Sequence, residues 1–196
     1  YRLGVRMMTL TWNFKNEIAS PNIDYFKIDR DSKEKPKFEP NLIDGITDFG
    51  KEVVKEMNRL GMVIDCSHLG DKGFYDVVSL SEKPIVCSHS CSRTVCNHVR
   101  NMTDDMLLKL KENNGVVGIN YCRSYVREDE GEATVVDLVK HITYIKNLIG
   151  IEHIGLGSDF DGISNKDIEL KDASMMNLLI EELQRQGYTQ EEIDAI

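Results

Sequence analysis

The sequence has 196 residues, of which 24 are lysine or arginine and 33 are aspartate or glutamate, so its formal net charge at pH 7 is −9. This length suits one domain, residues 1–196, and is enough to bury a hydrophobic core. The acidic balance argues against a nucleic-acid or anionic-lipid surface and favours a small-molecule substrate, and no apolar run approaches the roughly 18 residues of a membrane-spanning helix.

The cysteines indicate the cellular compartment of the protein. The five cysteines are odd in number, and three lie in apolar runs where a free thiol acts as a small hydrophobic side chain. This usage, without a signal peptide, predicts a reduced, cytoplasmic protein.

The two ends of the sequence indicate that it is a piece of a longer chain. Tyr1 directly precedes an apolar stretch, and Thr189 starts a capping box shortly before the sequence stops. We therefore expect a piece that lacks an N-terminal part and the extreme C-terminus.

Strand and helix patterns alternate along the chain. Continuous apolar runs predict strands, and apolar residues at helical spacing, with capping residues, predict the helices between them. The predicted strands are 5–10, 62–66, 85–87, 115–120 and 154–157. The predicted helices are 49–60, 74–80, 104–113, 134–149 and 170–186. Such repeated βα units indicate an α/β fold with a parallel sheet covered by helices, and about five strands fit part of a (β/α)8 TIM-type barrel.

One segment, 13–47, breaks this alternation. It contains three of the four prolines and the charge run 27–37. A loop of this length in a compact domain is usually functional or mobile. Two interpretations stay open, a solvated surface insertion and a lid over an active site.

Two segments repeat one another. Residues 62–68 and 84–89 both run from apolar residues into Cys-Ser-His, so His68 and His89 follow neighbouring predicted strands. In a (β/α)8 barrel, side chains at the carboxyl ends of strands point to a shared mouth. Neutral imidazole is a good ligand for zinc. The two histidines are therefore candidate metal ligands, and a hydrogen-bonded core or rim position is the alternative.

Further candidate groups follow the third and last predicted strands. Asp159 is a candidate general acid or base for a metal-bound water. Asp161 would share its face if the backbone stayed extended, but a turn residue before Gly162 is the better interpretation. Arg100 is either a clamp for a substrate carboxylate or a surface arginine. The other three histidines have no strand-end position and are expected on the surface or rim: His98, His141 and His153.

Six motifs carry a resemblance to one family. They are Leu3-Gly4-Val5-Arg6, the run 49–61, Ile64-Asp65-x-x-His68, Ser88-His89-Ser90, Arg100-Asn101 and Gly157-x-Asp159-Phe160-Asp161-Gly162. Together they resemble the membrane dipeptidase (renal dipeptidase) family of zinc-dependent dipeptidases. The resemblance runs along nearly the whole chain and keeps the spacing between motifs, which makes it far more specific than any single motif.

The resemblance implies a (β/α)8 barrel with two zinc ions bridged by a glutamate, and hydrolysis of dipeptides by a zinc-bound hydroxide. It implies that His68 and His89 ligate metal. It also implies that Arg100 holds the carboxylate of the substrate and that Asp159 assists proton transfer. The His-x-Asp motif and bridging glutamate of the family precede the region that matches Tyr1. The chain by itself is therefore expected to bind metal weakly and to be nearly inactive.

One position departs from the family pattern. Many members carry a substrate-contacting histidine after Leu-Thr, and this sequence has Trp12 there. Trp12 either marks a subgroup with different substrate contacts or is a core aromatic residue. Two other functions also stay open: another barrel-type metal-dependent hydrolase, such as a deaminase or phosphoesterase, and a non-catalytic α/β module. A homodimer is one option for the assembly.

Overall fold

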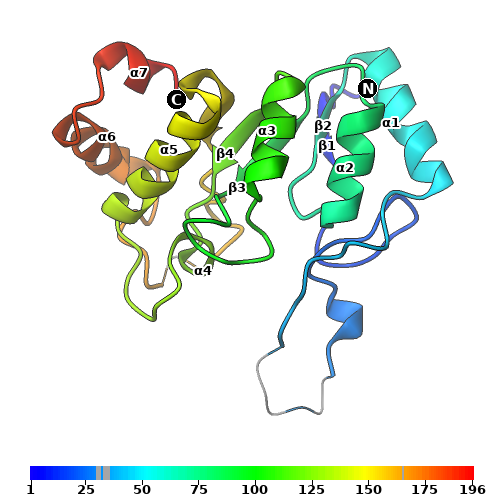
Figure 1. Ribbon diagram of the computed structural model, residues 1–196, viewed down its shortest axis with the longest axis horizontal. Coiled ribbons are helices and arrows are strands. Elements are labelled where there is room, and N and C mark those ends of the chain that lie inside the picture. The colour runs from blue at the N-terminus through cyan, green and yellow to red at the C-terminus, as the bar shows by residue number, and fades with distance from the viewer. Residues whose placement is uncertain (30–31, 33–35, 165) are drawn as a thin grey trace. The chain divides into compact units, whose positions relative to one another are not determined.

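The computed structural model describes residues 1–29, 32, 36–164 and 166–196. The chain divides into two compact units, Tyr1–Val86 and Cys87–Ile196, and each combines parallel strands with helices (Figure 1). Part of the charge run 27–37, namely 30–31 and 33–35, lies outside the described residues. Within the described ranges there are five strands, each parallel to its neighbours, as the sequence predicts.

The strands of the first unit are short and consecutive. Strand β1 (Met7–Thr9) pairs in parallel with β2 (Val63–Asp65), and Asp65 of β2 is paired with Val86. Val86 is the first residue of β3 (Val86–Ser90), which continues into the second unit. The order β1-β2-β3 therefore follows the chain, as repeated βα units require.

Helix α1 (Asp48–Leu60) begins and ends at residues that the sequence marks as caps. The hydroxyl of Thr47 accepts a hydrogen bond from a first-turn N–H at 3.0 Å. Gly61 ends the helix with a φ of 69°, a left-handed conformation that glycine adopts without strain. Val54 and Met57 lie on its buried face. Local sequence is enough to define this helix, and its predicted end at residue 60 is confirmed.

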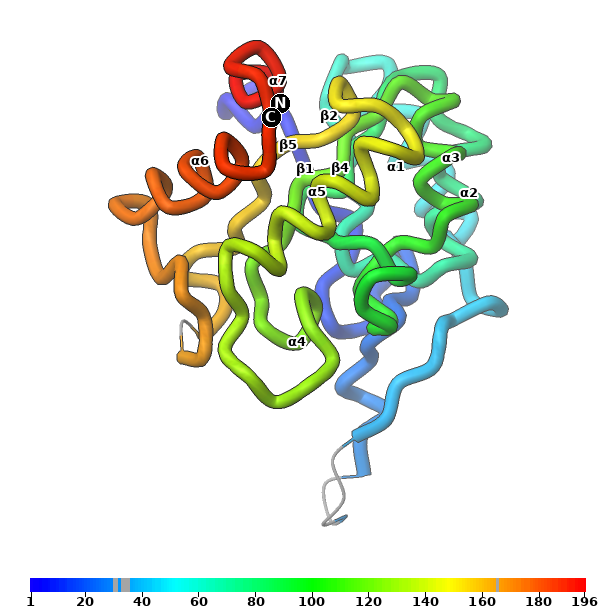
Figure 2. The backbone as a smooth tube through the Cα atoms, turned by 60° about the vertical axis from the view of Figure 1, so that its left-hand side comes forward, coloured from blue at the N-terminus to red at the C-terminus, as the bar shows by residue number. Residues whose placement is uncertain are grey.

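The base of the long segment 13–47 is part of the core. Residues 19–24 are buried, and Asn22 exchanges two hydrogen bonds with Asp71, the first residue of α2 (Asp71–Leu80). Asn22 donates to the carboxylate of Asp71 at 2.7 Å and accepts its N–H at 3.1 Å. This distant side chain satisfies the helix N-terminus, so α2 begins three residues earlier than predicted. Figure 2 shows the described residues 25–29 and 36–40 of the segment extending away from these helices.

In the second unit, the order β3-β4-β5 continues along the chain. Strands β4 (Val116–Ile119) and β5 (Ile154–Leu156) pair in parallel, with Gly118 opposite Gly155. The helices of this unit are α3 (Asp104–Glu112), α4 (Arg123–Val126), α5 (Val135–Ile149), α6 (Met176–Arg185) and α7 (Gln190–Asp194). Helix α5 packs against both α3 and α6 (Figure 1).

Helix α6 departs from the prediction of a helix over 170–186. It begins at Met176, after a 3-10 turn over Ala173–Met175. The carboxylate of Asp172 accepts the N–H of Ser174 at 2.9 Å and so caps this turn. Side-chain capping by aspartate competes with helical backbone hydrogen bonds, which delays the helix. Short turns elsewhere, η1 (Tyr25–Lys27) and η2 (Ile151–His153), also lack a periodic sequence signal.

The strands of the second unit approach closely at two glycines. A Cβ at Gly118 would lie 2.1 Å from the carbonyl oxygen of Ser88, and a Cβ at Gly157 would lie 2.0 Å from the same oxygen. Both positions therefore require glycine. Gly155 differs, because its Cβ would lie 3.5 Å from the Val116 side chain, an ordinary contact. Along the described ranges, no helix has the length and apolar character needed to cross a membrane.

We expect Gly118→Ala to lower the free energy of unfolding by about 2 kcal/mol, because forcing a methyl group into a packed site costs about 1–3 kcal/mol. Urea denaturation followed by circular dichroism measures this loss. Gly155→Ala is the matched control and should keep the wild-type midpoint. Equal midpoints for the two variants would contradict the close approach of these strands.

Candidate functional site

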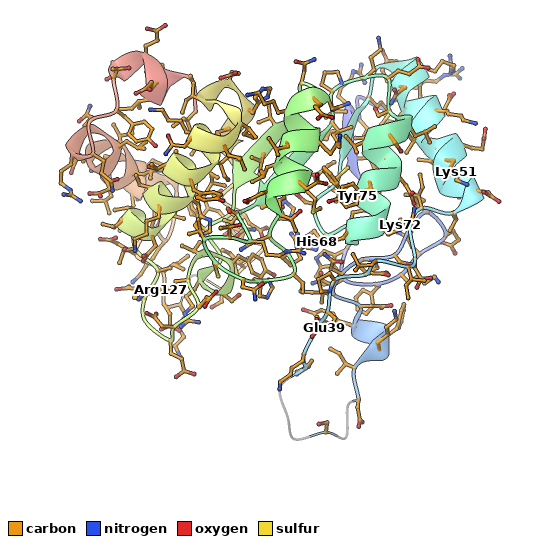
Figure 3. All side chains as sticks on the ribbon, in the orientation of Figure 1. Glu39, Lys51, His68, Lys72, Tyr75 and Arg127 are labelled. Atoms are coloured by element: carbon orange, nitrogen blue, oxygen red, sulfur yellow. The ribbon has the colours of Figure 1, made fainter. Side chains whose placement is uncertain are left out.

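His68 lies just beyond β2 (Figure 3). A hydrogen bond to Asn13 orients its ring. Its backbone is left-handed, with a φ of 71°, a conformation that non-glycine residues adopt mainly at constrained sites. Its Nδ1 lies 2.9 Å from the Oδ1 of Asn13. An amide oxygen only accepts hydrogen bonds, so Nδ1 carries the proton and Nε2 carries the lone pair. This tautomer, with a hydrogen bond on the outer nitrogen, is the usual form of a metal-binding histidine.

Asp65 supports the turn that carries His68. This buried carboxylate accepts the N–H of Ser67 at 3.0 Å and the hydroxyl of Thr9 at 2.6 Å. The first bond folds the chain into a turn directly after β2, and the second ties that turn to β1. His68 is therefore presented by a turn with its own buried anchor.

His89 occupies a different kind of position, inside β3. The repeated Cys-Ser-His segments predicted that both histidines follow the end of a strand, and this prediction is wrong for His89. The physical reason lies one residue before each repeat. Asp65 turns the first segment out of its strand, whereas Val86 has no side-chain acceptor, so β3 continues through the second segment. The Nδ1 of His89 lies 2.8 Å from the hydroxyl of Ser88.

Arg100 is buried, with only 5% of its surface exposed, so its interpretation as a surface arginine is wrong. Its Nη2 donates to the carbonyl oxygen of His89 at 3.4 Å. Its guanidinium carbon lies 5.5 Å from the centre of the Tyr125 ring, within the range of a cation–π contact. The guanidinium is thus tied to the backbone of a candidate metal ligand.

His98 shares the surroundings of Arg100. Its ring centroid lies 4.5 Å from that of Tyr125, and its Nδ1 accepts the backbone N–H of Arg100 at 3.1 Å. Burial and the positive charges of Arg100 and Arg93 lower the pKa of His98 to about 4. His98 is therefore neutral at pH 7, and the local field is positive. Such a field suits the binding of an anion.

Asp159 lies in a turn after β5. Its φ is 63°, and its carbonyl oxygen accepts the N–H of Gly162 at 3.0 Å. Asp161 also has a positive φ, 64°, so the extended backbone that would bring both carboxylates to one face does not persist. Asp161 as a turn residue is confirmed. The carboxylate of Asp159 accepts a hydrogen bond from the Nδ2 of Asn120 at 3.2 Å.

Asn120, which contacts the candidate Asp159, was not predicted from the sequence. It directly follows β4 and is fully buried, and its Oδ1 accepts the N–H of Cys122 at 2.5 Å. That bond orients the amide, which then presents its Nδ2 to Asp159. The available signal was the apolar run 115–119 ending in a polar residue, the same pattern that singled out the other candidates.

Two histidines expected on the surface or rim are buried, which corrects that prediction. The Nδ1 of His141 accepts the N–H of Ser92 at 3.1 Å, and its Nε2 donates to the carbonyl of Val126 at 3.0 Å. The Nδ1 of His153 donates to the carbonyl of Gly115 at 2.8 Å. Both rings satisfy backbone groups in the core, a role with no periodic sequence signal. Burial lowers the pKa of His141 to about 4.

Among the described residues of each unit, metal-binding groups are not clustered. In the part of the chain that the structure describes, no three histidine, cysteine, aspartate or glutamate side chains converge as a metal site. His68 belongs to the first unit and His89 to the second. The tautomer and outer hydrogen bond of His68 nevertheless fit a metal ligand.

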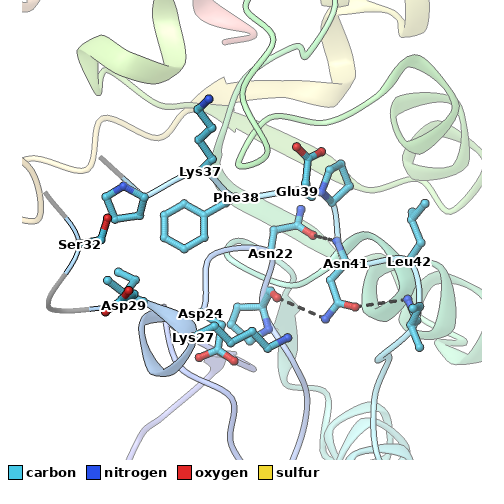
Figure 4. A pocket seen from close by; sticks show the side chains of 15 residues that line it. Asn22, Asp24, Lys27, Asp29, Ser32, Lys37, Phe38, Glu39, Asn41 and Leu42 are labelled. Carbon is cyan, nitrogen blue, oxygen red and sulfur yellow. Dashed lines mark hydrogen bonds between the residues drawn. The ribbon is translucent and has the colours of Figure 1, made fainter. Parts of the chain in front are cut away.

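A hollow of about 700 Å³ lies within the long segment of the first unit (Figure 4). Residues between 21 and 43 line it, and the N–H of Asn41 donates to the Oδ1 of Asn22 at 2.8 Å. None of the four candidate site residues is among its lining residues. This hollow is therefore separate from the candidate metal ligand of the same unit.

The profile of the membrane dipeptidase family (Peptidase family M19) matches residues 1–196. The chain belongs to the membrane dipeptidase family. An uncharacterized dipeptidase of Schizosaccharomyces pombe is 36% identical over 200 residues, which cover all of this chain and 45% of that protein. Dipeptidase aclJ of Aspergillus oryzae is 37% identical over 197 residues, covering all of this chain and 43% of that protein.

A solved relative agrees with this assignment. The metallo peptidase from Rhodobacter sphaeroides, liganded with a phosphinate mimic of the dipeptide L-Ala-D-Ala, is 30% identical with a TM-score of 0.85. The match covers all of this chain and 53% of that one, so the chain spans about half the length of these relatives. The predicted family and the α/β fold class are confirmed.

We expect the protein to lose stability as the pH falls from about 6.5 to about 4, because His141 stays neutral when folded but binds a proton when unfolded. The contribution of His141 to this loss reaches about 2 kcal/mol at pH 4.5. Urea denaturation at pH 7 and pH 4.5 measures it. His141→Gln, which removes the titrating group, should lose less stability between the two pH values. Equal losses in the variant and the wild type would contradict the neutral, buried state of His141.

Proposed function

We propose that the complete protein is a zinc-dependent dipeptidase with two metal ions. The observation that carries this proposal is the match of the membrane dipeptidase family to the whole chain. The match favours a dipeptidase over a deaminase, a phosphoesterase or a non-catalytic α/β module. The buried contact between Arg100 and the backbone of His89 supports it, because it joins a carboxylate-binding group to a candidate metal ligand.

His68 and His89 would supply two of the metal ligands. Asn13 holds the Nδ1 proton of His68, so the Nε2 lone pair is the donor to the metal. The complete metal site would need further ligands besides these two histidines. When bound, zinc would polarise the peptide carbonyl and lower the pKa of a nucleophilic water.

Arg100 would bind the C-terminal carboxylate of the dipeptide. A guanidinium offers two parallel N–H donors that match a carboxylate. The Tyr125 ring and the His89 carbonyl restrict the guanidinium, so little conformational freedom is lost when substrate binds. Burial is the main cause of the lowered pKa of His98, and the positive charges of Arg100 and Arg93 add to it. The same two charges would attract the substrate carboxylate.

Asp159 would transfer a proton from the attacking water to the amide nitrogen of the scissile bond. Asn120 donates to its Oδ2, which leaves Oδ1 to take a proton from the attacking water. The same oxygen then delivers that proton to the amide nitrogen as the carbon–nitrogen bond breaks, releasing the second amino acid as an amine. Because Asn120 is itself anchored to the backbone of Cys122, the carboxylate keeps one orientation through both transfers.

The cysteines support the proposal of a reducing compartment such as the cytoplasm. None of these five described residues forms a disulfide, and four of them are buried. Burial raises the pKa of Cys96 to about 11, so this thiol stays protonated at pH 7 and reacts slowly. Thiols of this kind act as small packing groups.

We expect Asp159→Asn in the complete, zinc-loaded protein to lower kcat for dipeptides by about 100-fold or more, because the proton carrier is lost. Dipeptide hydrolysis and zinc content are measured together. Asp161→Asn is the matched control, since it lies in the same turn with the same backbone conformation, and it should keep near wild-type kcat. The absence of zinc-dependent hydrolysis in the wild type would contradict the proposed function.

We expect Arg100→Ala to reduce kcat/KM for dipeptides by about 10- to 100-fold, mainly through KM, because a charge-assisted hydrogen bond contributes about 1.5–3 kcal/mol. Dipeptide amides, which lack the carboxylate, serve as control substrates. The variant and the wild type should hydrolyse the amides at similar, low rates. An equal loss of kcat/KM for dipeptides with a free carboxylate and for dipeptide amides would show that Arg100 does not bind the carboxylate.

A further inference from the structure

Five aromatic side chains of the first unit form a connected cluster, the aromatic patch. Its members are Trp12, Phe14, Tyr25, Phe26 and Phe38. The ring of Phe14 lies 5.5 Å from that of Trp12, 5.5 Å from that of Tyr25 and 4.8 Å from that of Phe26. The Tyr25 and Phe38 rings lie 6.3 Å apart. The patch thus gathers five of the fourteen aromatic residues in the sequence into one segment.

The aromatic patch is in contact with water. Trp12 is 57% exposed and Phe26 is 72% exposed, which corrects the interpretation of Trp12 as a core residue. Isolated exposed apolar residues are common on protein surfaces, whereas a contiguous exposed group marks a binding surface. The aromatic patch is therefore suited to bind an apolar ligand.

The aromatic patch borders the candidate metal ligand. The rings of Trp12 and His68 lie 6.5 Å apart. Their common link is Asn13, whose Oδ1 accepts the Nδ1 proton of His68 and whose backbone carbonyl accepts the N–H of Tyr25 at 2.9 Å. The patch and the imidazole are thus held by one buried residue.

A second buried residue fixes the turn that carries the patch. The carboxylate of Asp24 accepts the N–H of Phe26 at 3.1 Å and caps the turn η1. Asp24 and Asn13 together restrain the backbone on both sides of Tyr25. Because its backbone is restrained, the aromatic patch needs little ordering when a ligand binds.

We infer that the aromatic patch binds a side chain of the dipeptide and selects large apolar or aromatic side chains. The inference rests on the proposed function, because it requires the scissile bond to be held beside His68. Consecutive Cα atoms lie about 3.8 Å apart, so a dipeptide at His68 has a side chain within reach of Trp12. Indole offers an apolar face and one N–H donor but no acceptor, so apolar side chains gain most.

The test compares Gly-Gly, Phe-Gly and Gly-Phe as substrates of the complete, zinc-loaded protein. We expect kcat/KM for at least one phenylalanine dipeptide to exceed that for Gly-Gly by about tenfold or more, the selectivity typical of an apolar pocket. Trp12→Ala should remove most of this preference through KM, and Trp12→Phe should retain it. Phe49→Ala is the matched control, since Phe49 is 59% exposed on α1 and outside the aromatic patch.

A binding measurement gives a readout besides activity. Trp12 is the only tryptophan in this sequence, so the difference in fluorescence between the wild type and Trp12→Phe reports on the aromatic patch. A phosphinate dipeptide mimic with a benzyl side chain should change this difference signal more than a mimic without side chains. Equal changes would overturn the inference.

The remaining outcomes separate this inference from the proposed function. Hydrolysis of all three dipeptides at similar kcat/KM overturns the inference and leaves the dipeptidase function in place. A change from dimer to monomer in Trp12→Ala, with the substrate preference unaltered, identifies the patch as a contact between two copies and also overturns it. A wild type without dipeptidase activity overturns the proposed function itself.

Discussion

The candidate site of the first unit depends on one buried hydrogen bond, from the Nδ1 of His68 to the Oδ1 of Asn13. It sets the tautomer of the imidazole and holds the ring in one orientation. Removing either partner would leave a buried polar group unsatisfied, which costs about 1–3 kcal/mol. Because the carbonyl of Asn13 also accepts the N–H of Tyr25, the same residue connects the candidate metal ligand to the aromatic patch. The imidazole of His68 and the aromatic patch thus share one structural support.

The second unit follows the same principle at Asp159. Both His68 and Asp159 have left-handed backbones, which non-glycine residues keep only where neighbouring groups enforce them. In each unit an asparagine amide orients the side chain of that residue, Asn13 the imidazole of His68 and Asn120 the carboxylate of Asp159. An amide suits this role because it carries an acceptor and donors but no charge. It therefore orients a titratable group without adding a charge of its own.

The sequence predicted correctly those helices and strands that are marked by residues close together in the chain, such as caps and apolar runs. The caps and periodicity of α1 and the apolar runs of the strands were sufficient, and the candidates His68, His89, Arg100 and Asp159 came from their places after such runs. The supporting residues were not predictable in this way. Asn13 lies 55 residues from its partner, and no periodic pattern links the two. For the same reason a Cys-Ser-His repeat did not guarantee a repeated structure, because one side chain, that of Asp65, ends one strand while the other continues.

The residues around Trp12 differ in their exposure to solvent, and this difference bears on substrate specificity beside His68. Trp12 points to solvent, whereas Thr11 and Asn13 on either side are buried. Alternation of this kind separates the residue that meets a substrate from the residue that supports His68. The tryptophan at position 12 offers apolar surface and no hydrogen-bond acceptor, and it leaves the bond between Asn13 and His68 in place. In the proposed site, position 12 would therefore be free to tune the substrate preference, while position 13 is constrained by its hydrogen bond to His68.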